Sequence, residues 1–172
     1  AAAEIFQFGS ATAPFRVRDR AVALRARKPK GRTAMSRRSG QCLCGRVKVV
    51  VRGEPLRVGI CHCSDCRKES GSAFTFYAVW PRPAFEWTGE TATFRGQSFC
   101  PSCGSRLFSA DAEEAEIKLG ILSDPPVGLV PGYELWIKRR EPWLRPIEGA
   151  EQYDEDRPEP QPQDVPGPPG PT

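Results

Sequence analysis

Short runs of apolar residues follow one another through the middle of the chain. The run at 46–51 alternates before it becomes fully apolar, and 73–80 is rich in aromatic and β-favouring residues, so each is expected to form a strand. The same pattern predicts further strands at 56–60, 85–87, 91–95, 106–109, 116–122 and 135–137. Glycine and proline clusters separate the runs and indicate turns. The pattern predicts an all-β domain of short antiparallel sheets without an internal repeat.

The two ends of the chain lack this pattern. Residues 1–34 are rich in Ala and Arg, and Met35 is the single methionine. Two interpretations stay open for 1–34: an extraneous extension ahead of a start at Met35, which we favour, or an organelle transit peptide. After residue 147 acids and prolines take over, a composition that cannot offset the entropy of ordering. We expect a disordered or extraneous extension at 1–38, a zinc-binding domain at 39–147 and an acidic, proline-rich disordered tail at 148–172.

Length and charge narrow the classes of function. A chain of 172 residues suits one domain, and no run approaches the roughly 18 apolar residues of a membrane span. The net charge of +4 divides into +6 for 1–34, +4 for 35–147 and −6 for 148–172. Seven thiolates with two Zn²⁺ would bring the middle part to about +1. We therefore expect neither a membrane nor a nucleic-acid partner, while a homo-oligomer stays open.

Seven cysteines carry the candidate chemistry. The sequence shows no secretory signal pattern, so a reducing compartment is expected, and we place the protein in the cytoplasm unless 1–34 is a transit peptide. Cysteines one or two residues apart would form strained disulfides. Metal ligation is therefore favoured, and Zn²⁺ is the usual ion among soft sulfur donors.

Four of the cysteines form two short knuckles. Cys100 and Cys103 stand in a C-x-x-C-G motif, in which Gly104 can take the positive φ that turns backbone N–H groups toward sulfur. Cys42 and Cys44 are two residues apart, so their side chains project from one face of an extended chain. Together they predict a closed structural zinc site that contributes folding energy.

The other three thiols, at Cys61, Cys63 and Cys66, lie within six residues. The only histidine, His62, lies between two of them and must point away from a shared ion, so we expect it on the surface or behind the ligands. A second structural zinc closed by a distant carboxylate or water is one interpretation. We favour an open site, because no fourth ligand is evident. Arg67 and Lys68 would offset the thiolate charge or meet an anionic substrate, or else simply form a solvated turn.

Four segments resemble the glutathione-dependent formaldehyde-activating enzyme family, which also includes centromere protein V-like proteins. They are 40–45 (GQCLCG), 61–68 (CHCSDCRK), 70–74 (SGSAF) and 99–105 (FCPSCGS). The resemblance covers roughly residues 39–147 and implies the β-tent fold. It also implies a structural zinc on Cys42, Cys44, Cys100 and Cys103, and a catalytic zinc on Cys61, Cys63 and Cys66.

The activity that the resemblance implies is a carbon–sulfur lyase reaction that joins formaldehyde to glutathione. Arg67 and Lys68 are the candidate glutathione contacts. Residues 122–125 (LSDP) and 142–144 (PWL) also look like family segments, but Glu134 stands where many members carry a histidine. A substrate contact at that position would alter specificity for glutathione. The alternative function is a non-catalytic zinc module that binds a protein partner.

Overall fold

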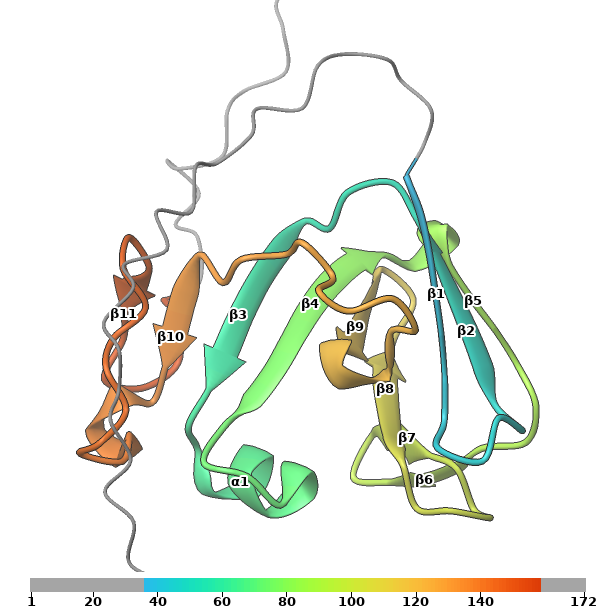
Figure 1. Ribbon diagram of the computed structural model, residues 1–172, viewed down its shortest axis with the longest axis horizontal. Coiled ribbons are helices and arrows are strands. Elements are labelled where there is room, and N and C mark those ends of the chain that lie inside the picture. The colour runs from blue at the N-terminus through green and yellow to red at the C-terminus, as the bar shows by residue number, and fades with distance from the viewer. Residues whose placement is uncertain (1–35, 159–172) are drawn as a thin grey trace, which may run out of the picture. The chain divides into compact units, whose positions relative to one another are not determined.

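The computed structural model describes residues 36–158, so the expectations for 1–35 and 159–172 lie outside it. Within that range the chain forms eleven strands, one α-helix and three 3₁₀ turns (Figure 1). The strands are β1 (Arg37–Gln41), β2 (Lys48–Arg52), β3 (Arg57–Cys61), β4 (Thr75–Pro81), β5 (Phe85–Thr88), β6 (Ala92–Phe94), β7 (Gln97–Phe99), β8 (Arg106–Ala110), β9 (Glu114–Lys118), β10 (Tyr133–Leu135) and β11 (Glu151–Gln152). The helix is α1 (Ser64–Ser70), and the turns are η1 (Arg82–Ala84), η2 (Leu119–Ile121) and η3 (Ile137–Arg139). The all-β class is confirmed.

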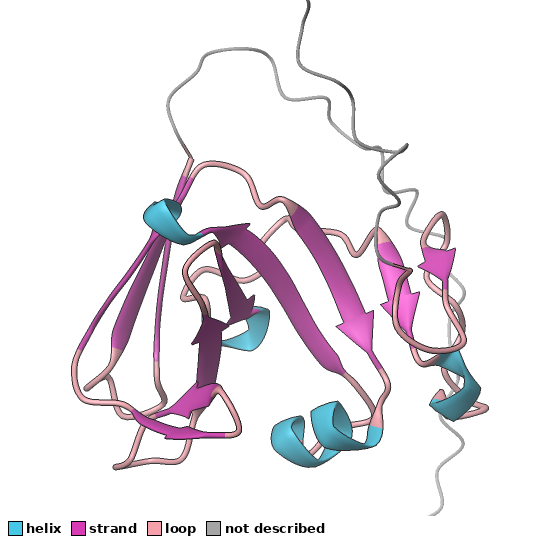
Figure 2. Ribbon diagram, turned by 180° about the vertical axis from the view of Figure 1, so that it is seen from behind, coloured by secondary structure: helices cyan, strands magenta, loops and turns pink. Residues whose placement is uncertain are grey.

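Two sheets share these strands. The smaller has the order β1-β2-β5, and the larger has the order β11-β10-β3-β4-β9-β8-β7-β6. Figure 2 shows the smaller sheet standing across from the larger one. Most pairings are antiparallel as predicted, but β10 runs parallel to both β3 and β11, so the prediction is wrong for those two pairs. Parallel pairing of β3 with β10 requires a long connection, and about seventy residues separate the two strands.

Burial on both faces explains why the sequence of β4 is a nearly continuous run of apolar residues. Ala78 and Trp80 face the main core, together with valines of β2 and apolar residues of β8 and β9. Tyr77 and Val79 face the other way and pack against Cys61 and its neighbours. Both faces of β4 are covered, and such a strand loses the alternation of a half-exposed one.

The predicted strands between 46 and 109 all overlap observed ones. The residues at 85–87 and 91–95 do not form a hairpin with each other, however, because β5 pairs with β2 and β6 pairs with β7. Two predicted strands end early: η2 begins at Leu119, and η3 follows β10. Strands β1, β7 and β11 and the helix were not predicted.

The predicted domain limits at residues 39 and 147 are too narrow. Strand β1 begins at Arg37, which pairs with Arg52. At the other end, residues 148–158 continue the fold, since β11 pairs with β10 and the Tyr153 N–H donates to the Glu134 carbonyl at 2.9 Å. Backbone hydrogen bonds hold this segment, and they leave no apolar pattern in the sequence.

No helix in the described range is long and apolar enough to cross a membrane, since α1 has only seven residues.

Candidate functional site

The first cysteine cluster joins the end of β1 to the turn between β7 and β8. The sulfur atoms of Cys42, Cys44, Cys100 and Cys103 all lie within 4.8 Å of one another. Cys44 Sγ is 3.5 Å from Cys42 Sγ and 3.7 Å from Cys100 Sγ. Zn–S bonds of about 2.3 Å place sulfur pairs about 3.8 Å apart in a tetrahedron. The four donors therefore fit a zinc ion.

Backbone geometry supports this cluster as predicted. Gly104 has a φ of 74°, and its N–H donates to the Cys100 carbonyl at 2.8 Å. The Val47 N–H donates to Cys42 Sγ at 3.2 Å. The Ser105 hydroxyl and N–H lower the pKa of the Cys103 thiol to about 5, which favours its thiolate form. The thiolate is the form that binds a metal.

The second cluster is built by the helix that the sequence did not predict. Cys61 ends β3, and Cys63 caps the N-terminus of α1 by accepting the Cys66 N–H at 3.4 Å. The first helical turn then carries Cys66 back toward Cys61, and the three sulfur atoms lie within 4.8 Å of one another. The hydrogen bond to Cys61, followed by burial, raises the pKa of Cys66. Such crowding of thiols is relieved when a cation binds.

This second cluster has three members. Within residues 36–158 no carboxylate, imidazole or further thiol joins Cys61, Cys63 and Cys66 at the same spacing. Three soft donors with no fourth protein ligand match the pattern of a zinc site that keeps one position for water or substrate.

His62 points away from the thiols as predicted, but it does not lie on the surface. Its side chain is fully buried, with Nε2 at 3.1 Å from Glu134 Oε2 and Nδ1 at 3.3 Å from the Ala73 carbonyl. The ring also meets Phe74 edge to face, at 5.8 Å between centroids. The imidazole therefore anchors the loop between two of the cysteines to the protein interior.

Glu134, considered above as a possible substrate contact, is fully buried on β10. Its carboxylate accepts hydrogen bonds from Gln152 Nε2 at 2.9 Å, Arg140 Nη1 at 3.3 Å and the Ile147 N–H, besides facing His62. Burial alone raises the pKa of this carboxyl, but the donors outweigh burial and lower it. Because the side chain has no exposed surface, Glu134 acts as an internal anchor for the residues that follow β10.

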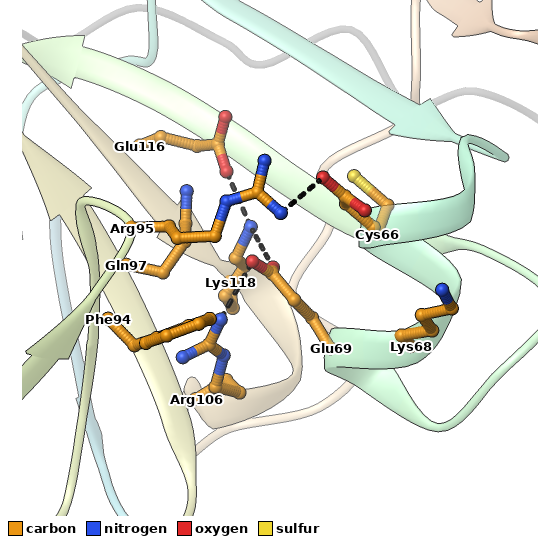
Figure 3. Close-up of a pocket in the computed structure, with 10 residues that line it drawn as sticks. Cys66, Lys68, Glu69, Phe94, Arg95, Gln97, Arg106, Glu116 and Lys118 are labelled. Atoms are coloured by element: carbon orange, nitrogen blue, oxygen red, sulfur yellow. Dashed lines mark hydrogen bonds and ion pairs between the residues drawn. The ribbon is translucent and has the colours of Figure 1, made fainter.

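A pocket of about 390 Å³ lies directly beside Cys66 (Figure 3). Its walls come from α1, the β6–β7 hairpin, β8 and β9, all of which contribute lining residues. Phe94 provides an aromatic wall, and Figure 3 shows the Cys66 thiol at one end. The second cluster thus opens onto a cavity, as a substrate-binding site requires.

The inner part of the pocket holds a network of ion pairs. Lys118 Nζ lies 2.7 Å from Glu116 and 3.5 Å from Glu69, and Arg106 lies 2.7 Å from the same Glu69. Burial lowers the pKa of Lys118, but the two carboxylates outweigh burial and raise it. These cations are therefore charged and already paired.

The charged residues at the rim of the pocket are more exposed and less fully paired than those inside it. Arg95 reaches an ion pair with Asp65 at 3.3 Å, in which both side chains are largely exposed. Lys68 is exposed and forms no ion pair with any residue in the described range. The rim therefore presents two cations against a single carboxylate.

Two buried side-chain atoms in residues 36–158 have no hydrogen-bond partner, Gln97 Oε1 and Arg106 Nε. Both belong to residues that line this pocket. Buried polar groups are nearly always paired with protein or water, so their concentration here marks the pocket as a place where further polar groups are accommodated.

Sequence reasoning grouped Arg67 with Lys68, and the structure separates them. Lys68 lines the pocket. Arg67 turns to the other side of the helix, where its guanidinium donates to the Arg139 carbonyl at 2.9 Å and pairs with Glu141. The rim cation Arg95 was missed because it comes from a hairpin turn about thirty residues further along the chain, and nothing in the sequence links it to Cys66.

A sequence model of the family described as "Glutathione-dependent formaldehyde-activating enzyme" matches residues 37–139. No curated protein sequence matches the chain significantly. Among solved structures, a Rhodobacter sphaeroides protein is 24% identical, with a TM-score of 0.41, over 54% of this chain and 97% of that one. A likeness at that level adds nothing to the description of the fold or the site.

Proposed function

The chain belongs to the glutathione-dependent formaldehyde-activating enzyme family, and on that premise we propose that it is a zinc-dependent carbon–sulfur lyase acting on a small thiol adduct. The substrates proposed are formaldehyde and glutathione. One observation carries the proposal: three thiols converge with no fourth protein ligand among residues 36–158, and one of them lines a pocket with cations at its rim.

The two clusters are proposed to have different tasks. Cys42, Cys44, Cys100 and Cys103 hold a structural zinc, and their complete set of four donors supports this role. Cys61, Cys63 and Cys66 hold the catalytic one. When bound there, the ion would keep the substrate sulfur ionised and aligned with the electrophile.

The proposed reaction balances without an oxidant or reductant. The thiol sulfur adds to the carbonyl carbon of formaldehyde, an S–C bond forms as the C=O π bond opens, and the thiol proton ends on the oxygen. The residues of the chain orient the reactants: Phe94 and the paired inner cations shape the cavity, and Lys68 at the rim meets the carboxylates of glutathione. Reducing conditions in the cytoplasm, the compartment proposed, would keep all seven thiols available for metal.

Metal analysis of the zinc-loaded protein and of Cys66→Ser tests this proposal. The wild type is expected to hold two zinc ions per chain, one for each cluster, and Cys66→Ser to hold one while its far-UV circular dichroism is unchanged. A Cys66→Ser protein that still held two ions would contradict the open site.

The choice between an enzyme and a non-catalytic zinc module requires a second measurement. Cobalt in place of zinc reports thiolate ligands through charge-transfer absorption, and we expect added glutathione to perturb that absorption in the wild type. A cobalt spectrum indifferent to glutathione, together with the absence of turnover of formaldehyde, would favour the binding module.

A further inference from the structure

The turn of the β6–β7 hairpin has an unusual residue at its tip. Phe94 pairs with Gln97, so Arg95 and Gly96 form a two-residue turn, and both have a positive φ, 49° and 79°. Turns of this kind favour Gly, Asn or Asp, because a longer side chain is strained in the left-handed region. An arginine at the first position therefore places a long cation at the tip in spite of a conformational penalty.

The strained turn directs this cation over the pocket mouth. Figure 3 shows the Arg95 side chain extending from the hairpin across the cavity toward the end that holds Cys66, where its guanidinium reaches Asp65 at 3.3 Å. Asp65 directly precedes Cys66 in the first turn of α1. The guanidinium therefore lies at the end of the pocket that holds Cys66, one thiol of the cluster that we propose as the catalytic site.

The Arg95–Asp65 pair is easily exchanged. The side chains are 69% and 60% exposed, and ion pairs so open to water contribute little stability. Deeper in the pocket, Lys118 and Arg106 are 10% and 21% exposed, and each is fixed by a carboxylate of the chain. An incoming carboxylate can therefore displace Asp65 from Arg95, whereas the inner pairs resist exchange.

We propose that Arg95 is a specificity-determining residue that selects thiols carrying a carboxylate over neutral and cationic thiols. Asp65 holds the guanidinium over the pocket mouth in the free protein, and the substrate carboxylate takes its place, with Lys68 as the second cation at the rim. Phe94 is neutral and the inner cations are already paired with carboxylates, so Arg95 and Lys68 are the cations that meet an incoming charge first. This inference rests on the proposed function, since it requires a thiol to bind beside Cys66.

Binding of matched thiols to the cobalt-loaded full chain tests the inference. The probes are 3-mercaptopropionate, which is anionic, 2-mercaptoethanol, which is neutral, and cysteamine, which is cationic. Arg95→Gln is expected to weaken binding of 3-mercaptopropionate about three- to fivefold, the upper range for one exposed ion pair, and to leave binding of 2-mercaptoethanol unchanged. Asp65→Asn is expected to strengthen binding of 3-mercaptopropionate a few-fold, because the carboxylate that competes for Arg95 is gone.

Arg52→Gln is the matched control. Arg52 is also an arginine in an exposed ion pair, with Glu86 at 2.7 Å, but it lies on β2 and does not line the pocket. Its loss should change none of the three affinities. Added salt should narrow the difference in affinity between 3-mercaptopropionate and 2-mercaptoethanol for the wild type, since charges at an exposed rim are screened.

The outcomes separate the inference from the function beneath it. If all three thiols perturb the cobalt spectrum and Arg95→Gln keeps the wild-type ratio of affinities, the role of Arg95 is wrong and the proposed thiol site stands. If no thiol perturbs the spectrum of the wild type, the proposed site itself fails. A loss of affinity of about three- to fivefold confined to 3-mercaptopropionate supports both.

Discussion

Glu134 and His62 are 72 residues apart in the chain, yet their fully buried side chains meet at 3.1 Å. His62 lies between Cys61 and Cys63, so the carboxylate on β10 fixes the loop that carries two thiols of the second cluster. Both ring nitrogens face oxygen acceptors, because Nδ1 lies 3.3 Å from the Ala73 carbonyl. The contact makes the geometry of the second cluster depend on the C-terminal part of the domain.

Replacing this carboxylate should destabilise the fold. Glu134→Ala leaves the His62 ring, the Arg140 guanidinium and the Gln152 amide without a shared acceptor in the interior. Loss of one partner in a buried charged network costs about 3 kcal/mol, and we expect that reduction in the free energy of unfolding by urea. Glu134→Gln, which keeps one acceptor oxygen, should cost about half as much.

Glu86→Ala provides the control for this loss. Glu86 pairs with Arg52 on the surface, and its removal should leave the urea midpoint close to that of the wild type. Equal effects of Glu86→Ala and Glu134→Ala would refute the anchoring role of the buried pair.

The same carboxylate predicts a dependence of stability on pH. Hydrogen bonds lower the pKa of Glu134 in the folded state, against 4.5 for an ordinary glutamate. The ionised carboxylate therefore stabilises the fold fully at neutral pH, and this contribution disappears as the pH falls below about 4.5 toward the folded-state pKa. Urea midpoints measured between pH 7 and pH 3 should fall less steeply for Glu134→Gln than for the wild type.

Glu113→Gln removes an exposed carboxylate from the turn before β9 and should keep the wild-type profile. A Glu134→Gln profile parallel to the wild type would show that this carboxyl does not carry the acid sensitivity.

The sequence predicted those features of the molecule that depend on residues close together in the chain. The division of seven thiols into four and three follows from spacing, and the structure gathers the sulfur atoms in those two groups. Helix α1 escaped prediction because it buries no residue and has no apolar face; the Cys63 cap begins it, and Gly71, with a φ of 60°, ends it. The burial of Glu134 and the position of Arg95 over the pocket depend on contacts between distant strands, for which one sequence holds no signal.

Close approach of β3 and β10 makes Gly59 a sensitive position. Gly59 pairs with Tyr133, and a Cβ at Gly59 would lie 2.5 Å from the Tyr133 ring. Gly59→Ala should push β10 away and cost about 2 kcal/mol in unfolding by urea, as overpacking does elsewhere. Gly120→Ala is the control, because nothing lies within 4 Å of its added Cβ, and it should be nearly neutral. Similar losses in both variants would mean that β10 does not press on Gly59.

Arg67 and Lys68 are neighbours in sequence, but we expect substitution of Arg67 to lower stability and substitution of Lys68 to weaken substrate binding. Arg67 joins α1 to the segment after η3 through the Arg139 carbonyl and Glu141, so Arg67→Ala should lower the unfolding free energy by about 1 to 2 kcal/mol. Lys68 has no ion-pair partner in the described range, so Lys68→Ala should leave the free energy of unfolding within about 0.5 kcal/mol of the wild type. The same substitution should weaken binding of glutathione in the cobalt titration. Urea unfolding and the titration together check both variants. The contrary result is that Arg67→Ala weakens glutathione binding as much as Lys68→Ala does. In that case the substrate would have to approach from the opposite side of α1, and the pocket beside Cys66 would not be its binding site.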